Sequence, residues 1–123
     1  EIPASKIFMG IPNYGYDWTL PYVRGESKSQ SLSNVEALRL AGEKNAEIMF
    51  SETAQTPYFN YFERNSRGGA SEHVVWFDDA LSMDSKLRLI SEYGLYGGGV
   101  WNVMKYFPAL WTVMNSLYNI RKL

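Results

Sequence analysis

Cysteine is absent from the 123-residue sequence, and histidine occurs only once, as His73. Without cysteine the chain has no disulfide, no thiolate nucleophile and no cysteine-bound zinc or iron–sulfur site. A Ser-His-Asp triad or a multi-histidine metal site could draw only on His73. We therefore expect neither a metal site nor a bound cofactor. The cell compartment stays open, because many secreted proteins also lack cysteine.

Long apolar runs and an excess of either charge are also missing. No stretch approaches the roughly 18 uncharged apolar residues that a membrane-spanning helix needs. The 12 Lys and Arg residues stand against 13 Asp and Glu residues, giving a formal net charge of −1. That balance favours neither a nucleic acid nor an anionic membrane as partner. The chain begins at Glu1 and not at Met, so we expect it to be a segment of a longer protein. The lack of a basic-then-apolar leader therefore says nothing about secretion.

Aromatic side chains, in contrast, are abundant. They make up 15% of the residues and include 9 Tyr and 4 Trp. This share favours the binding of flat, partly apolar ligands such as sugars. The length and the 46% hydrophobic content fit one globular domain with a real core.

Four segments predict a strand, helix, strand, helix order. The run KIFMGI at 6–11 has the length and flanking residues of a buried strand. A helix is predicted over 82–93, followed by a second strand over 97–103 and a last helix over 108–118. Such a unit is expected to be right-handed with parallel strands. Two strands and two helices cannot cover both faces of a parallel sheet, so the sequence predicts a slice of a larger α/β fold.

The middle of the chain predicts a small α+β unit between residues 26 and 77. Residues 12–18 contain Pro, Asn and Gly and are expected to form a loop, as are residues 21–33. Ser33 and Glu36 have the spacing of a capping box. The elements expected beyond the capping box are a helix over 34–44 and strands over 46–50, 58–63 and 73–77.

Aromatic residues follow both parallel strands, where ligands meet an α/β sheet. Tyr14, Tyr16 and Trp18 follow the first strand, and Trp101 ends the second. A Trp indole can lie flat under a pyranose ring and exclude water. The alternative, that Trp101 is a core residue without a ligand, is given about equal weight because large aromatics dominate cores.

Three other motifs favour structural roles. Asp78 and Asp79 could form a catalytic carboxylate pair, but capping of the next helix is favoured by about four to one. For His73, at the start of a predicted strand, a surface or hydrogen-bonding role outweighs catalysis. The three glycines at 97–99 enter a strand, whereas a phosphate-binding loop follows a strand and opens a helix.

Taken in order, five segments resemble the C-terminal part of glycoside hydrolase family 18 catalytic domains. Within that family, the resemblance is strongest to the spore-associated cortex-lytic and coat enzymes. The GIPxYG and WFxDxxSxxxK patterns together make the resemblance specific, and it covers essentially the whole chain. The segments are KIFMGIPNYGYDW (6–18), AEIMFSETAQTPYFNYFE (46–63), HVVWFDDALSMDSKLRLISEYGL (73–95), GGGVWNVMKYFPALW (97–111) and YNIRKL (118–123).

The resemblance implies a (β/α)₈ barrel, of which this chain would be the C-terminal segment. Residues 6–11 and 98–103 would be strands seven and eight, and the helices at 82–93 and 108–119 would follow them. The chain would then divide into strand seven with its loop (1–25), an α+β insertion that raises one wall of the groove (26–77), and helix seven, strand eight and helix eight (78–123).

The resemblance also implies a chemistry. The family cleaves β-1,4 bonds next to N-acetylglucosamine, and the substrate's own acetamide acts as the nucleophile. A Glu in a DxxDxDxE motif protonates the leaving oxygen. That motif is absent from these residues, so the catalytic Glu would lie upstream and no catalytic residue is expected in this chain.

By the same resemblance, Trp101 matches the family's eighth-strand Trp, which stacks under the reacting sugar. Tyr14 and Tyr16 match the loop that lines the groove, and Trp18 is expected to bind substrate with them. Two positions depart from the branch. Ser51 stands where an acidic residue is common, and Lys105-Tyr106 replaces a more apolar pair.

These observations lead to one main expectation and two alternatives. We expect a fragment of a retaining glycosidase that acts on an N-acetylglucosamine-containing polysaccharide, either spore cortex peptidoglycan or a chitin-like polymer. Its location would be secreted or spore-associated, and its other partner would be the upstream remainder of the barrel. Alone, the fragment should be inactive, and its open strand edges predict self-association. The alternatives are a non-catalytic, lectin-like relative and a structural coat protein.

Overall fold

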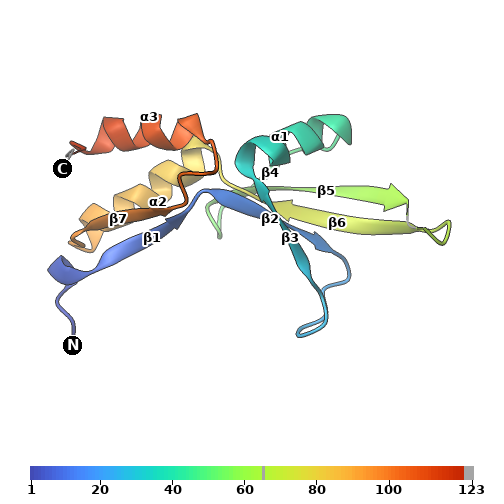
Figure 1. Ribbon diagram of the computed structural model, residues 1–123, viewed down its shortest axis with the longest axis horizontal. Helices are drawn as coiled ribbons and strands as arrows, with labels where there is room; N and C mark the ends of the chain where they lie inside the picture. The colour runs from blue at the N-terminus through green and yellow to red at the C-terminus, as the bar shows by residue number, and fades with distance from the viewer. Residues whose placement is uncertain (65, 121–123) are drawn as a thin grey trace.

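The computed structural model describes residues 1–64 and 66–120. They form two sheets that lie side by side, with two helices beside one sheet and one helix beside the other (Figure 1). No helix in these two ranges is long and apolar enough to cross a bilayer. The elements are η1 (Ala4–Lys6), β1 (Phe8–Pro12), β2 (Tyr14–Thr19), β3 (Ser29–Ser33), α1 (Asn34–Glu43), β4 (Met49–Ser51), β5 (Thr56–Arg64), β6 (Ala70–Trp76), α2 (Ala80–Glu92), β7 (Gly97–Trp101) and α3 (Pro108–Leu117).

The first sheet contains β1 and β7, which pair in parallel from Phe8↔Gly97 to Pro12↔Trp101. The chain passes between them through α2, and α3 follows β7. Both helices pack on the face of the sheet that carries Ile11, in a core with Met83, Leu87 and Leu110. The predicted parallel β-α-β-α order is therefore confirmed.

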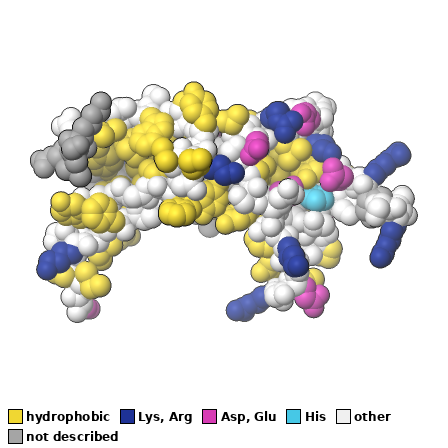
Figure 2. Space-filling view, viewed as in Figure 1, with side chains coloured by type: hydrophobic (Ala, Val, Ile, Leu, Met, Phe, Trp, Pro, Cys, Tyr) yellow, Lys and Arg dark blue, Asp and Glu magenta, His cyan; other side chains and the backbone are white. Residues whose placement is uncertain are grey.

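The other face of this sheet has no such cover. Phe8 and Tyr96 remain exposed there although their rings touch, with centroids 4.9 Å apart. Figure 2 shows hydrophobic side chains gathered over the part of the molecule that contains α3, β1 and β7. An α/β sheet normally has both faces covered, so this half of the molecule is an open piece of such a sheet.

The second sheet has five antiparallel strands in the order β3-β2-β6-β5-β4. Helix α1 covers one face, where Ala37 and Ala41 pack against Phe59, Val75 and Phe77. The helix begins with the expected capping box: the Ser33 side chain accepts from the Glu36 N–H, and the Glu36 carboxylate accepts from the Ser33 N–H. The second sheet thus has one buried face and one uncovered face.

Two loop predictions were wrong. Residues 12–18 do not form a loop: β1 continues to Pro12 and β2 begins at Tyr14. The expected loop over 21–33 contains strand β3. The loop over 12–18 was predicted from its Pro, Asn and Gly residues, of which Gly15 lies inside strand β2. This position of the strand has no room for a side chain. A Cβ at residue 15 would lie 2.9 Å from the Phe77 Cβ and closer still to the Trp76 carbonyl oxygen. The five-stranded sheet consequently starts before residue 26, where the insertion was expected to begin.

Other boundaries shift by a few residues. The strand expected over 46–50 is β4, at Met49–Ser51, because residues 44–46 form the capping turn that follows α1. There Asn45 has a positive φ of 50°, and the Ala46 N–H donates to the Ala41 carbonyl. The strand expected over 97–103 ends at Trp101.

Candidate functional site

Trp101 lies at the carboxyl end of β7, opposite Pro12 in the register of the first sheet. The residue is 69% exposed and lies on the uncovered face, and the peptide bond to Asn102 is cis. Within the described residues, Trp101 therefore lies outside both hydrophobic cores, and the alternative of a barrel-core residue stays a prediction for the intact barrel. An exposed indole at a strand end is able to stack under a sugar ring.

A buried amide fixes the segment that follows Trp101. The Asn13 Nδ2 donates to the carbonyls of Asn102 (2.9 Å) and Lys105 (3.0 Å), while its Oδ1 accepts from the Asn102 N–H at 2.9 Å. The Asn13 N–H also donates to the Trp101 carbonyl at 3.2 Å. Four hydrogen bonds from one residue thus join the start of the second sheet to the chain around Trp101. The sequence alone does not reveal this role, because Asn beside Pro and Gly is also typical of a loop.

Tyr14, Tyr16 and Trp18 alternate along β2 and so lie on one face of the five-stranded sheet. The Tyr14 and Tyr16 ring centroids are 5.6 Å apart, and those of Tyr16 and Trp18 are 6.3 Å apart. Contact with the Tyr16 hydroxyl raises the pKa of Tyr14 above its usual 10.0. Gly15 and Asp17 point to the opposite face, which α1 covers, so these three rings line the uncovered face.

Two further aromatic residues continue this face across the strands. Trp76 of β6 pairs with Tyr16 on one side and with Tyr58 of β5 on the other. The Trp76 and Tyr58 rings stack with centroids 4.5 Å apart and an interplanar angle of 23°. This pair could not be predicted from the sequence, because strand register joins residues far apart in the chain. The aromatic alternation in β5 was its only local signal.

A shallow cavity of about 210 Å³ lies where the two sheets meet. It combines aromatic walls with the polar side chains at the start of α2. The residues that line it are Pro12, Tyr14, Gly15, Tyr16, Thr56, Trp76, Phe77, Asp78 and Lys86.

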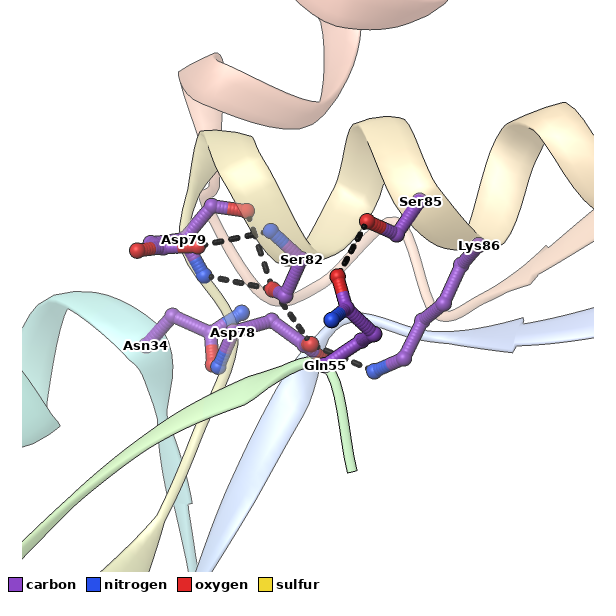
Figure 3. A network of polar contacts seen from close by, with 7 residues as sticks. All are labelled: Asn34, Gln55, Asp78, Asp79, Ser82, Ser85 and Lys86. Carbon is purple, nitrogen blue, oxygen red and sulfur yellow. Dashed lines mark hydrogen bonds and ion pairs between the residues drawn. The ribbon is translucent and has the colours of Figure 1, made fainter. Parts of the chain in front are cut away.

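The polar end of the cavity is formed by Asp78, which is buried (Figure 3). Its carboxylate accepts from the Ser82 hydroxyl at 2.8 Å and forms an ion pair with the Lys86 ammonium. The Asp78 N–H donates to the Asn34 Oδ1 at 2.8 Å. Asp78 is therefore held at the junction of α1, β6 and α2.

The neighbouring Asp79 is the N-cap of α2, as predicted. Its carboxylate accepts from the Ser82 N–H at 2.8 Å, and its own N–H donates to the Ser82 hydroxyl at 2.9 Å. The two carboxylates thus accept from different groups of Ser82, and the predicted capping role belongs to Asp79.

The sequence profile of glycosyl hydrolases family 18 matches residues 1–105, which is most of the chain. The chain belongs to this family. Among curated proteins, it is 40% identical over 122 residues to the cortical fragment-lytic enzyme of Bacillus subtilis (strain 168), an alignment that covers 99% of this chain.

Solved structures of the family agree with this assignment. The spore cortex-lytic enzyme SleL of Bacillus megaterium QM B1551 is 38% identical and superimposes on 100% of this chain with a TM-score of 0.87. A chitinase of Chromobacterium violaceum ATCC 12472 is 29% identical over 93% of this chain, with a TM-score of 0.76. The chain thus folds as an α/β fragment whose structural neighbours are chitinase-like family 18 domains.

The chain spans only between about a quarter and a third of the length of these relatives. It covers 27% of the Bacillus subtilis enzyme, 28% of the SleL chain and 33% of the chitinase chain. Most of each relative therefore has no counterpart in the residues described.

His73 of this family 18 chain lies outside the candidate site. Its Nδ1 is 2.9 Å from the Asp17 Oδ1, and its ring stacks on Tyr61 with centroids 4.7 Å apart. The Tyr61 hydroxyl donates to the other Asp17 oxygen at 2.5 Å. Burial, followed by this contact with Asp17, raises the pKa of Tyr61 well above its ordinary value. All three side chains lie on the face that α1 covers, so the predicted hydrogen-bonding role of His73 is confirmed.

The structure also shows where the two positions lie at which the sequence departs from the spore-associated branch. Ser51 lies in β4, and its hydroxyl accepts from the Ala54 N–H at 3.2 Å, so it closes a turn. Lys105 is partly buried beside the Asn13 contacts, whereas Tyr106 is exposed. Within the described residues, no group of three or more Asp, Glu or His side chains is arranged to hold a metal ion.

Proposed function

We propose that the intact protein is a retaining glycosidase that cleaves N-acetylglucosamine-containing glycan. In this proposal the chain is the C-terminal segment of a (β/α)₈ barrel, with β1 as strand seven and β7 as strand eight. The observation that carries it is the exposed indole of Trp101 at the carboxyl end of a parallel strand, on the uncovered face of its sheet. Family membership supports the same reading.

Hydrolysis would follow the family's substrate-assisted route. The substrate acetamide attacks the anomeric carbon while an upstream Glu protonates the leaving oxygen. This chain supplies binding and orientation. Trp101 stacks under the reacting ring, and the hydrogen bonds of Asn13 hold the backbone after it. Tyr14, Tyr16 and Trp18 form a wall beside that ring and exclude water from it.

The substrate we propose is spore cortex peptidoglycan, and the location is the spore. The support is the similarity to proteins named cortical fragment-lytic enzyme and spore cortex-lytic enzyme. The exposed aromatic faces suit the apolar faces of β-linked sugars. No cofactor enters the proposed reaction.

The test is Trp101→Ala in the intact protein, assayed on purified cortex fragments and on a chitin oligomer. Loss of the stacking surface should lower kcat/KM by about tenfold or more, which corresponds to at least 1.4 kcal/mol of lost transition-state binding. Trp111→Ala is the matched control, because this partly exposed Trp lies on α3. Unchanged turnover of Trp101→Ala would remove the indole from the site. Glycan binding without any hydrolysis by the wild type would replace the enzyme with a lectin-like protein.

A second test concerns the chain alone. The general acid of such an enzyme supplies about 10²–10⁴-fold of the rate, and we assign it to a residue outside this chain. Purified 1–123 should therefore release no reducing sugar from chitin oligomers. Hydrolysis by this polypeptide would contradict the assignment.

A further inference from the structure

The two sheets of the molecule have separate hydrophobic cores. The cluster that contains Ile11 and Leu110 lies between the first sheet and its two helices, and the cluster that contains Phe59 and Val75 lies under α1. The two clusters share no residue. Because apolar packing is non-directional and acts within each half, the angle between the two sheets depends mainly on polar contacts where the chain crosses between them.

One buried residue holds each crossing. Asn13 holds the first crossing, from β1 to β2, through the hydrogen bonds already described. Asp78 holds the second crossing, from β6 to α2, and its side chain is 4% exposed. Its N–H donates to Asn34 of α1 at 2.8 Å, and its carboxylate accepts from Ser82 of α2 and pairs with Lys86 of the same helix. Asp78 therefore joins the helix of the five-stranded sheet to a helix of the first sheet.

A second contact joins α2 to the five-stranded sheet. The Ser85 hydroxyl donates to the Gln55 Oε1 at 3.1 Å. Gln55 lies between β4 and β5, and its Nε2 donates to the Glu52 carbonyl at 2.8 Å, within the same turn. Ser85 and Lys86 are neighbours on α2, so this helix contacts the other half of the molecule at two points (Figure 3).

Stability alone does not account for these residue types. A buried ion pair is no more stabilising than apolar side chains of similar volume. Asn34 is fully buried, and its Nδ2 has no hydrogen-bond partner among the described residues, which costs stability. Charge-assisted hydrogen bonds do, however, impose a defined distance and direction. The network around Asp78 is therefore suited to fixing a geometry.

We propose that Asp78 and Lys86, together with the contact between Ser85 and Gln55, are positioning groups that fix the angle between the two sheets. The wall rings of β2 belong to the five-stranded sheet, whereas Trp101 belongs to the first sheet, so the network sets the distance from the wall to the indole. The inference rests on the proposed function for the role of that wall. The angle itself can be measured without catalysis.

The experiment measures the distance between two spin labels in the intact protein by pulsed electron resonance. Phe62→Cys places one label on β5 and Glu92→Cys places the other on α2; both positions are exposed, and this chain contains no cysteine that would compete. We expect one narrow distance distribution. Lys86→Met, which removes the cation of Asp78, should broaden or shift it, and Lys86→Arg should restore it. An unchanged distribution in Lys86→Met would overturn the proposal.

Arg88→Met is the matched control. Arg88 lies on the same helix and pairs with Asp84 four residues away, so its loss removes a cation without touching the five-stranded sheet. The label distribution should stay unchanged, and a change as large as in Lys86→Met would overturn the assignment. If Lys86→Met fails to fold, Ser85→Ala removes only the contact with Gln55 and should broaden the distribution. An unchanged distribution in Ser85→Ala would then count against the proposal.

Kinetics with N-acetylglucosamine hexamer give a second measurement. Lys86→Met should raise KM about tenfold and leave kcat within about twofold, because the wall is displaced while Trp101 stays in place. Ser85→Ala should change KM in the same direction, although Ser85 does not line the cavity. A raised KM in Lys86→Met with an unchanged label distribution would mean that Lys86 contacts the ligand directly, which overturns the positioning role. If the wild type cleaves no glycan, the proposed function fails, and the label distances still decide this inference.

Discussion

At the scale of single residues, Asn13 contributes more than any other described side chain to the geometry around Trp101. It occupies the one position between β1 and β2 and is almost fully buried. Its amide satisfies two carbonyls and one N–H of the segment after Trp101. Buried backbone groups without partners are costly, so the chain depends on this residue for the conformation of that segment.

The Asn13→Ala variant tests that dependence. Three backbone groups would lose their partner, and we expect the free energy of unfolding to fall by about 2 kcal/mol or more. Urea denaturation measures the change. Asn60→Ala is the matched control, because Asn60 has one side-chain bond, to Glu72, at a less buried position, and it should cost less. Equal losses in the two variants would show that the Asn13 contacts add nothing special.

Tyr61 should give a pH dependence at the alkaline end. Its pKa is raised in the folded protein above the ordinary 10.0, chiefly by burial and then by the bond to Asp17. Above about pH 10 the unfolded chain releases this proton while the folded protein keeps it, so stability falls as pH rises. We expect the free energy of unfolding of the wild type to decrease from about pH 9 to about pH 11. The Tyr61→Phe variant, which cannot ionise there, should lose less over that interval in urea denaturation.

Gly15 is a position where a single methyl group should disturb the site. The Cβ of an alanine would meet the Phe77 Cβ and the Trp76 carbonyl at distances that require movement of β6. We expect Gly15→Ala to lower the free energy of unfolding by about 1–3 kcal/mol. Gly42→Ala, with open space around its Cβ inside α1, should instead be neutral or stabilising. Chemical denaturation of both variants gives the comparison, and equal stabilities would contradict it.

At the scale of elements, the two capping boxes fix where α1 and α2 begin. For α2, the Asp79 side chain and the Ser82 hydroxyl exchange hydrogen bonds with each other's backbone N–H. We expect Asp79→Ala to reduce stability by about 1 kcal/mol and Asp79→Ser to retain most of it. Thermal or urea unfolding distinguishes the two. A loss as large in Asp79→Ser as in Asp79→Ala would show that the cap is not the reason.

The elements differ in how far the sequence could predict them. Helix α1, helix α2 and the parallel strands β1 and β7 follow from local signals: capping residues, stop residues and apolar runs. Strands β2 and β3 do not, because Gly and Asn favour turns locally and the partners that make them strands lie far along the chain. In β2 the alternation of Tyr14, Tyr16 and Trp18 was the available signal.

The same distinction applies to the candidate site. Trp101 and Tyr14 could be predicted as site residues from the sequence. Trp101 lies at the end of one predicted parallel strand, and Tyr14 follows the other. Trp76, Tyr58 and the contacts of Asn13 could not be predicted, because their roles depend on register between strands and on hydrogen bonds across about 90 residues of sequence. Tertiary contact decides these positions, and no local pattern encodes it.

At the scale of the whole molecule, the described residues leave apolar surface exposed to solvent. Phe8, Tyr96 and Trp101 are exposed on one sheet face, and β1 and β7 each have one free edge. Unpaired edges and apolar faces promote association. We expect purified 1–123 to self-associate with rising concentration in sedimentation velocity.

Replacing Phe8 and Tyr96 together by Ser should weaken that association, since their rings form one exposed contact. Tyr93→Ser, at the exposed end of α2, serves as the control and should leave it unchanged. A wild-type polypeptide that remains monomeric at all concentrations would contradict the expectation.

The chain enters and leaves the five-stranded sheet at two points that lie close together. The chain departs through Asn13 and returns through Phe77 and Asp78, and residues from both crossings border one cavity. A segment whose two ends lie next to each other is an insertion that can be exchanged as a unit. A short turn could close the gap if it were removed, and a larger or smaller insert could replace it without moving β1, α2 or β7. The size of the five-stranded sheet, which carries the proposed wall beside Trp101, can therefore vary without a change in the strands and helices that position the indole.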